Sequence, residues 1–338
     1  MLRARTAGLA VAAVAVLGGC QRPPGPARAS HAREIMGTLA EVTAVAADRM
    51  TADAAVAAGY ARLEDVNRLM SDYVADSEVG RLNSLPAGTP IAVSPETLHC
   101  LQRALEICRA SGGTFDATCR PLVRLWKQAA AEGRLPSADE LRQARALVGP
   151  DRIAIDAERR CVWRVADGVQ VDLGGIAKGY ALDLAAEAMR GAGASGALVN
   201  VGGDVRAVGR DADGRPWQVG VKHPFQDGLF AVLSLTDRAV ATSGVQQRFY
   251  EIGGRRYSHI IDPRSGWPAE QSPSVTVIAA DGLTADAWAT AFSVLSVEEG
   301  RGLIEAGGAP GVEVLWISGS AEEPVADMTP GFAGYLAE

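Results

Sequence analysis

The amino-acid sequence predicts an α+β fold with mixed or antiparallel sheets and packed helices, and two observations carry that prediction. Over residues 33–150, apolar side chains recur mainly at the spacing of helices. After Gly149-Pro150, short alternating segments follow one another, which is typical of strands joined by turns. No internal repeat and no low-complexity linker is present. We therefore expect one domain over residues 33–338, made of two interlocked subdomains, helix-rich at 33–150 and sheet-rich at 151–338.

The helix-rich part begins with a partly alternating segment, residues 33–47, which predicts a first strand. Four helices are expected to follow. Ser137 and Glu140 form the capping-box signature of the last one. The other three show apolar residues at helical spacing over residues 52–70, 95–110 and 121–131.

The sheet-rich part contains many short alternating segments and one clear hairpin signal. Gly253-Gly254 separates residues 248–252 from 256–261, as a two-residue hairpin turn does. Two helices are expected at residues 284–295 and 297–306, before a strand at 312–317. The remaining strands are expected at residues 152–156, 161–165, 169–172, 197–201, 204–208, 216–221, 230–235, 238–242 and 274–280.

The N-terminal segment has the pattern of an export signal. Two arginines precede a short apolar run, residues 7–17, which ends at Leu17-Gly18-Gly19-Cys20 and resembles a bacterial lipoprotein signal. We expect removal of residues 1–19, lipidation of Cys20 and a flexible tether over residues 20–32. The alternative is a plain secretory signal with a chance cysteine. On the first interpretation the protein is exported and lipid-anchored on the outer side of the bacterial cytoplasmic membrane, in the periplasm if the cell is Gram-negative.

Composition and charge narrow the classes of function. The chain has 338 residues, of which 48% are hydrophobic and 22% charged, an ordinary globular composition. Its net charge of -7 gives no electrostatic support to nucleic-acid binding. Beyond Cys20, the four cysteines form no CxxC and no Cys/His cluster, so we expect buried free thiols rather than a zinc site.

The stretch VDLGGIAKGYALD, residues 171–183, is suited to holding an anion. A strand-like lead runs through Asp172 into two glycines, and a helical pattern follows Lys178. Backbone N–H groups and the positive end of a helix dipole would then point at one spot, with the lysine adding a mobile charge. The sequence contains no GxxxxGK[ST], and no GxGxxG that follows a predicted strand. The alternative is a glycine turn that lets a strand pack against a helix.

Two further patterns suggest a metal and a base. Asp286 and Thr290 are four residues apart, so on a helix they share a face and offer hard oxygen ligands suited to Mg²⁺; an aspartate stabilising a helix N-terminus is the alternative. His259 stands where a strand ends before a Pro-Gly turn, where it can act as a general base or simply bond to backbone. A hydrolase triad of Ser243, His259 and Asp262 is not supported, because the sequence contains no GxSxG elbow.

Eight motifs in order identify a family. Together they resemble the ApbE family of FAD:protein FMN transferases, and the match covers roughly residues 33–318. The motifs are Met36-Gly37-Thr38; Met70-Ser71-Asp72-Tyr73 with Ser77-Glu78 and Arg81-Leu82-Asn83; Phe115-Asp116-Ala117-Thr118 with Pro121-Leu122-Val123; Asp172-Leu173-Gly174-Gly175-Ile176-Ala177-Lys178-Gly179-Tyr180; Asn200-Val201-Gly202-Gly203-Asp204; Thr242-Ser243-Gly244; the run from His259 to Gly266; and Ala285-Asp286 with Ala289-Thr290.

The resemblance implies an ApbE-like, T-fold-like architecture and a chemistry. Such enzymes bind FAD with Mg²⁺ and pass the FMN half to a threonine or serine hydroxyl of an acceptor flavoprotein, releasing AMP. Departures from the family pattern fall at Ala117, Cys119 and Gln246. By carry-over, the metal ligands would be Asp286, Thr290 and the carbonyl of Gly175; the FAD contacts Met36, Tyr73, Thr114, Phe115, Asp116, Asp172, Lys178 and Ile261; and the catalytic residues His259, as base, and Asp286.

Two other functions remain open at this point. An FAD pyrophosphatase would use the same site with water as the acceptor, giving FMN and AMP. A non-catalytic flavin-binding or solute-binding lipoprotein would hold FAD and release no AMP. The pair of Asp286 and Thr290 together with His259 argues against pure binding, which needs neither.

Overall fold

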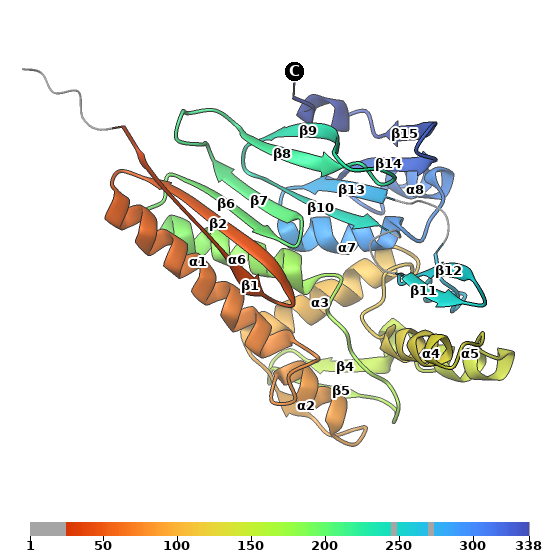
Figure 1. Ribbon diagram of the computed structural model, residues 1–338. Helices are drawn as coiled ribbons and strands as arrows, with labels where there is room; N and C mark the ends of the chain where they lie inside the picture. Colours follow the sequence, from red (N-terminus) through yellow and green to blue (C-terminus); the bar gives the residue numbers. More distant parts are fainter. Residues whose placement is uncertain (1–24, 245–248, 270–273, 338) are drawn as a thin grey trace, which may run out of the picture.

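An eight-stranded antiparallel sheet forms the centre of the computed structural model, which describes residues 25–244, 249–269 and 274–337 (Figure 1). Every neighbouring pair of its strands is antiparallel. The predicted α+β class with antiparallel sheets is confirmed. In spatial order the strands are β1 (Ala27–Ile35), β2 (Thr38–Ala46), β6 (Gly196–Val201), β7 (Asp204–Gly209), β10 (Arg238–Gly244), β13 (Ser274–Ala279), β14 (Glu313–Gly319) and β15 (Pro324–Met328).

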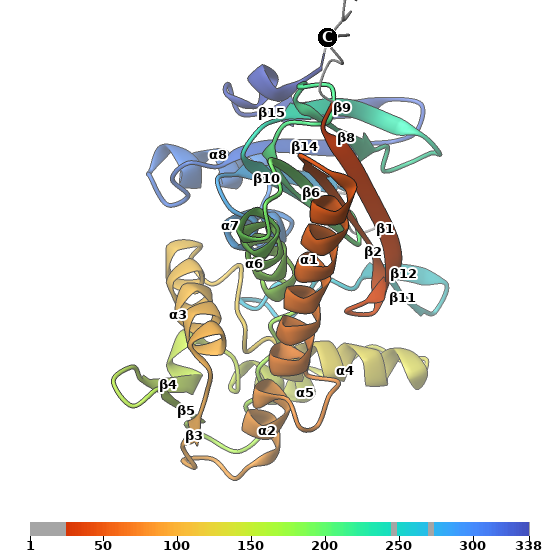
Figure 2. The same cartoon turned by 90° about the vertical axis from the view of Figure 1, so that its left-hand side faces the viewer.

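The two faces of this sheet are covered differently. Helices α1 (Arg49–Met70), α6 (Ala177–Gly191) and α7 (Gly282–Phe292) pack on one face, and the hairpin β8 (Trp217–Lys222) and β9 (Leu229–Leu235) covers the other (Figures 1 and 2). Because side chains of a strand alternate between faces, β10 serves both cores. Ala239 and Ala241 lie in the core under the helices, and Val240 lies in the core under the hairpin.

Most of the remaining elements lie below the sheet in the view of Figure 2. A third apolar cluster joins α4 (Arg120–Ala131), α5 (Ala138–Arg145) and the hairpin of β11 (Phe249–Ile252) and β12 (Arg255–Ser258). Helix α8 and two short 3-10 turns complete the structure. The other bounds are α2 (Glu78–Ser84), α3 (Pro95–Ala110), α8 (Val297–Glu305), the small sheet of β3 (Ile91–Ala92), β5 (Cys161–Arg164) and β4 (Ile153–Asp156), and the 3-10 turns Pro150–Arg152 and Phe332–Tyr335.

Several local predictions are confirmed. The capping box is complete, since the Ser137 hydroxyl accepts from Glu140 N–H and the Glu140 carboxylate accepts from Ser137 N–H. The hairpin predicted at Gly253-Gly254 forms with β11 and β12, and both glycines have positive φ. All four cysteines in the described residues are free thiols, as predicted, but the predicted burial holds only for Cys100 and Cys108, since Cys119 and Cys161 are half-buried.

The N-terminal predictions need correction. Residues 33–47 are not one strand but parts of two, because Met36 and Gly37 turn the chain with φ values of 53° and 71°. Residues 27–32 belong to β1, so they are not part of a flexible tether. The signal segment and Cys20 lie outside the described residues. Within the described ranges, no helix has both the length and the apolar character to cross a membrane.

Other corrections concern hydrogen bonding that sequence periodicity does not report. Residues 169–172 are not a strand; the N–H and carbonyl of Val171 bond to the Asn83 side chain at 2.7 and 2.8 Å instead of to a neighbouring strand. The segment predicted at 256–261 is a strand only to Ser258. The short elements α2, β3 and β15 were not predicted.

Candidate functional site

The site is built where α6 and α7 cross at two glycines. A Cβ placed on Gly179 would lie 2.0 Å from the carbonyl oxygen of Gly282, so the two backbones touch without side chains between them. Asp183 of α6 accepts hydrogen bonds from the N–H groups of Gly282 and Leu283, at 2.7 and 3.0 Å. It therefore holds the first turn of α7 against α6.

Asp286 is the buried carboxylate at the centre of this crossing. Its Oδ2 accepts from the N–H of Gly179 at 3.0 Å, and its Oδ1 accepts from Lys178 Nζ at 3.1 Å. Ile176 at the N-cap of α6 makes no side-chain cap bond, so Asp286 supplies negative charge to the start of that helix from α7. The expectation of a bare N–H group at the helix start is therefore wrong for Gly179.

Lys178 bridges two carboxylates from distant parts of the chain. It is ion-paired with Asp286 and also with Asp204, at the start of β7. The other oxygen of Asp204 accepts from the N–H of Thr242 on β10, at 3.2 Å. Helices α6 and α7 and strand β7 thus meet at one ammonium group, and β10 joins them through Asp204. The two carboxylates leave the three-residue cluster with a net charge of -1.

Burial is the largest single influence on the pKa values of both Asp286 and Lys178. It raises the pKa of Asp286 to about 6; Lys178 opposes the rise and Asp204 adds to it. For Lys178, burial disfavours the charged form, but the two carboxylates outweigh it and raise the pKa above its ordinary value. The lysine is therefore held as a cation beside the helix start, where it can neutralise charge on a ligand.

The residues predicted to bind metal lie next to this cluster. Thr290 follows Asp286 by one turn of α7, and a Cβ on Gly175 would stand 3.0 Å from Thr290 Oγ1 and 3.4 Å from Cε2 of Phe115. Across the described part of the chain, no group of three or more His, Cys, Asp or Glu side chains is placed to hold a metal. The donor set is instead one carboxylate, one hydroxyl and one backbone carbonyl, all hard oxygens of the kind Mg²⁺ takes together with waters and phosphates. Both oxygens of Asp286 already accept one hydrogen bond and retain a lone pair each, so the set fits Mg²⁺.

The turn at residues 114–118 is shaped by its own side chains. Asp116 Oδ1 accepts from the N–H and the hydroxyl of Thr118, at 2.7 and 2.6 Å, and Oδ2 accepts from Cys108 Sγ at 3.4 Å. Burial raises the pKa of Asp116, while the Thr118 bonds act against the rise. The Thr114 hydroxyl donates to the Ser111 carbonyl at 3.2 Å. The carboxylate of Asp116 thus holds the turn that presents Phe115 to Gly175.

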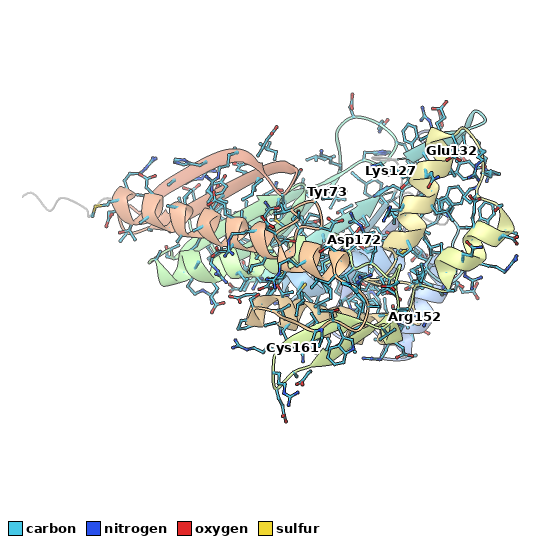
Figure 3. The ribbon with its side chains drawn as sticks, turned by 90° about the horizontal axis from the view of Figure 1, so that it is seen from below. Tyr73, Lys127, Glu132, Arg152, Cys161 and Asp172 are labelled. Atoms are coloured by element: carbon cyan, nitrogen blue, oxygen red, sulfur yellow. The ribbon has the colours of Figure 1, made fainter. Side chains whose placement is uncertain are left out.

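Asp172 and Tyr73, labelled in Figure 3, are more exposed than the buried cluster, and we call them the rim of the site. Asp172 N–H donates to the Ala117 carbonyl at 2.8 Å, and Asp172 Oδ1 accepts from Gly174 N–H at 2.8 Å. Tyr73 is 89% exposed in the turn after α1. Met36, at the tip of the β1–β2 hairpin, is partly buried against the main core.

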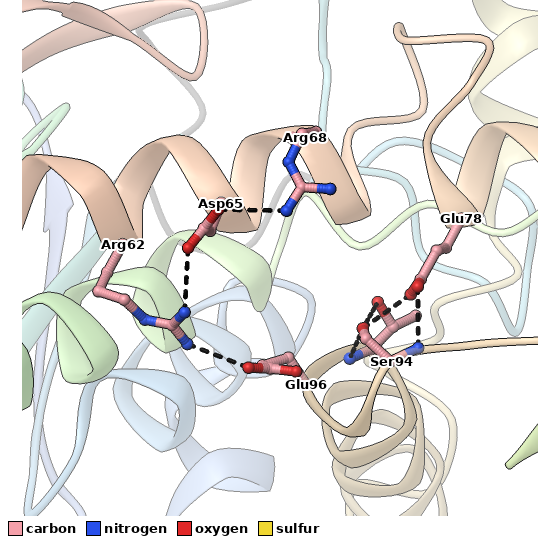
Figure 4. Close-up of polar contacts among 7 residues, drawn as sticks. Arg62, Asp65, Arg68, Glu78, Ser94 and Glu96 are labelled. Carbon is pink, nitrogen blue, oxygen red and sulfur yellow. Dashed lines mark hydrogen bonds and ion pairs between the residues drawn. The ribbon is translucent and has the colours of Figure 1, made fainter.

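The segment that follows Tyr73 is tied to α3 (Figure 4). Glu78, at the start of α2, accepts from both the N–H and the hydroxyl of Ser94, each at 2.8 Å. Arg62 of α1 joins Asp65 and Glu96 at 3.1 Å each. These contacts connect α1, α2 and α3, so the turn that carries Tyr73, between α1 and α2, is held at both of its ends.

His259 and Ile261 follow β12. Ile261 is buried and forms an isolated bridge with Pro268, while His259 is half-buried. Its role as a base stays a prediction. Both carboxylate oxygens of Asp262 accept from Arg264, at 3.0 and 3.1 Å, which argues further against a triad with Ser243.

Sequence reasoning missed two charged residues of the site. Asp204 stood in the Asn200–Asp204 motif without a role, and its position directly after a Gly202-Gly203 turn was the available signal. Arg120 was not singled out. It forms an ion pair with Asp72 and lies 4.0 Å from Asp172.

The fold and the site define a class: an α+β protein with a buried lysine–carboxylate centre at a helix start, suited to a phosphate-bearing ligand. The ApbE family model matches residues 36–316, and this chain belongs to that family.

Curated relatives and solved structures agree with the family assignment. The FAD:protein FMN transferase of Vibrio cholerae is 33% identical over 308 residues, which cover 89% of this chain and 91% of the relative. The FAD:protein FMN transferase of Escherichia coli K12 is 30% identical over 332 residues, 94% and 93% of the two chains. The ApbE protein of Thermotoga maritima has a TM-score of 0.82 at 29% identity, covering 92% of this chain and 100% of that one. The apo flavinyl transferase ApbE of Pseudomonas stutzeri has a TM-score of 0.79 at 29% identity, covering 92% and 97%.

Proposed function

We propose that this chain is a Mg²⁺-dependent FAD:protein FMN transferase. The hydroxyl oxygen of a threonine or serine in an acceptor flavoprotein attacks the phosphorus on the FMN side of the FAD pyrophosphate. The bond from that phosphorus to the oxygen shared with AMP breaks, AMP leaves, and the hydroxyl loses its proton. One observation carries the proposal: Lys178, Asp204 and Asp286 meet at the start of α6 in a chain whose relatives are such transferases.

In this reaction the buried cluster positions charge. Phosphoryl transfer is accelerated mainly by orientation and by charge placed where it develops. Lys178 is kept protonated beside the helix start by its two carboxylates. Mg²⁺ would be held by Asp286, the Thr290 hydroxyl and the Gly175 carbonyl, and when bound it would neutralise charge on the pyrophosphate.

The base and the flavin contacts are further parts of the proposal. His259 would take the proton of the acceptor hydroxyl, since an imidazole near neutral pH can hold it. Asp172 and Tyr73 on the rim, Met36 at the hairpin tip, the turn of Thr114 to Asp116, and Ile261 would contact the remainder of FAD.

Mass spectrometry of a candidate flavoprotein, incubated with this chain, FAD and Mg²⁺, tests the function. A mass gain of one FMN less one water, with AMP released in equal amount, is the expected result. AMP without any labelled protein would favour the pyrophosphatase. Retained FAD with no AMP, with every candidate acceptor, would favour a binding protein.

We also propose that the protein is exported and anchored by lipid on Cys20. The lipoprotein-like run Leu17-Gly18-Gly19-Cys20 supports this. Only six residues separate Cys20 from β1, so the domain would sit close to the bilayer surface. The wild-type chain should fractionate with membranes and incorporate labelled fatty acid. Cys20→Ala should do neither.

A further inference from the structure

Arg120 lies at a junction of three segments on the rim of the site. It is the first residue of α4, and its side chain is 21% exposed. Its guanidinium forms an ion pair with the buried carboxylate of Asp72 and lies 4.0 Å from Asp172 Oδ2. It also stands 5.8 Å from the centre of the Tyr73 ring, within cation–π distance. One side chain therefore links α4, the turn after α1 and the glycine loop before α6.

A hollow of about 350 Å³ opens beside this junction. Its walls include Asp72, Tyr73, Asn83 and Arg120. The Asn83 side chain bonds to both the N–H and the carbonyl of Val171, the residue before Asp172. These bonds hold the backbone next to Asp172, whose Oδ1 also accepts from Gly174 N–H at 2.8 Å, leaving Oδ2 toward Arg120. The exposed ring of Tyr73 stands against the Arg120 guanidinium.

The charges at this junction indicate what Arg120 does there. One guanidinium faces two carboxylates, so the group of Asp72, Arg120 and Asp172 has a net charge of -1. Without Arg120, Asp72 would be a buried unpaired charge and Asp172 would face it with like charge. A planar guanidinium suits this bridging position better than an ammonium, because it presents several donors in a fixed geometry and can stack on an aromatic ring.

We propose that Arg120 is a positioning residue for FAD: it orients Tyr73, which lines the hollow, and Asp172, which lies 4.0 Å from its guanidinium. The inference rests on the proposed function, because the ligand it serves is the flavin nucleotide. Arg120 itself touches neither the metal ligands nor Lys178 in any contact described above. Its removal should therefore weaken FAD binding more than it slows the transfer step.

The test compares Arg120→Ala and Arg120→Lys with Arg142→Ala, which removes an exposed arginine of α5. FAD affinity is measured by calorimetry without acceptor, KM and kcat for FAD with acceptor, and melting temperature for all four proteins. We expect Arg120→Ala to raise Kd and KM for FAD by about tenfold, or about 1.4 kcal/mol, with kcat changed by less than about threefold. Arg120→Lys should recover part of the affinity, and Arg142→Ala should match wild type.

Two results would overturn the inference. One is wild-type FAD affinity in Arg120→Ala. The other is a loss of FAD affinity that follows the fall in melting temperature in both Arg120→Ala and Arg120→Lys. That result would mean that Arg120 stabilises the fold and does not position FAD contacts. A wild-type chain that binds FAD but labels no acceptor would instead contradict the proposed function, and the binding measurements would still test Arg120.

Discussion

The buried centre of the site and its rim are built in different ways. At the centre, the side chains of Asp204 and Asp286 are 7% and 4% exposed, and their oxygens bond to Lys178 and to backbone N–H groups. At the rim, the Asp172 side chain is 34% exposed in an irregular segment before α6, and Tyr73 is 89% exposed in a turn after α1. The centre is fixed by the packing of two helices on a sheet, whereas the rim depends on loops.

Because of this difference, we expect the centre and the rim to have different roles. Charges that neutralise a pyrophosphate must be in place before the reaction, because reorganising them during it would cost energy. Groups that admit and release a large nucleotide can stand on loops held by a rigid scaffold. Substitutions at the centre should therefore affect the chemical step or the fold, and substitutions at the rim should affect binding.

The largest effect on activity is expected from Asp286→Ala. The change removes one proposed metal ligand, one partner of Lys178 and the acceptor for Gly179 N–H. FMN attachment measured by mass spectrometry should fall by roughly a thousandfold or more, as when a key charge-stabilising group is lost. Asp139→Ala, an exposed carboxylate on α5, is the control and should retain activity. Undiminished FMN attachment in Asp286→Ala would refute the metal assignment.

Gly179→Ala should damage the fold itself. The added Cβ would lie 2.0 Å from the Gly282 carbonyl oxygen and 2.8 Å from Cβ of Asp286, so α6 and α7 would have to separate. We expect the free energy of unfolding to drop by about 3 kcal/mol or more. Denaturant unfolding and the yield of soluble protein measure this. A variant as stable as wild type would show that the crossing has more room than the structure indicates.

Gly175→Val provides the contrast with Gly179→Ala, because we expect it to lower transferase activity more than the stability of the fold. The first added carbon would press on the Thr290 hydroxyl at 3.0 Å and on the Phe115 ring at 3.4 Å, and both neighbours are side chains. We expect transfer to fall at least about tenfold, since the proposed metal ligands are displaced, with a smaller loss of stability than in Gly179→Ala. Equal losses of melting temperature in the two variants would remove the distinction between site and scaffold.

Local patterns predicted the elements, and long-range contacts account for what was missed. Asp286 and Thr290 were found because an i, i+4 pair is visible in the sequence, and the capping box at Ser137 is equally local. The β1–β2 turn was missed because Met36 adopts positive φ, a conformation that is uncommon for methionine and that the sequence therefore does not predict. The pairing of Lys178 with Asp204 depends on how α6 settles on the sheet, and no spacing encodes that.

The smallest predicted effect concerns Asp183, which caps α7 from α6. Burial raises its pKa from 3.8 to about 6; the Gly282 and Leu283 N–H groups and Arg206 act against the rise, and Asp281 adds to it. The folded state therefore binds this proton more tightly than the unfolded chain. The stability that this proton contributes is present below about pH 4 and is lost as the pH rises through 6.

Asp183→Asn keeps an oxygen that can accept from one N–H group and removes the titration. Relative to wild type, its free energy of unfolding should therefore rise by roughly 1–2 kcal/mol between pH 4 and pH 7. Unfolding curves measured side by side at several pH values give this difference and cancel the titration of other groups. Parallel pH dependence in the two proteins would mean that Asp183 does not titrate in this range, and that the contact between α6 and α7 is insensitive to pH at this position.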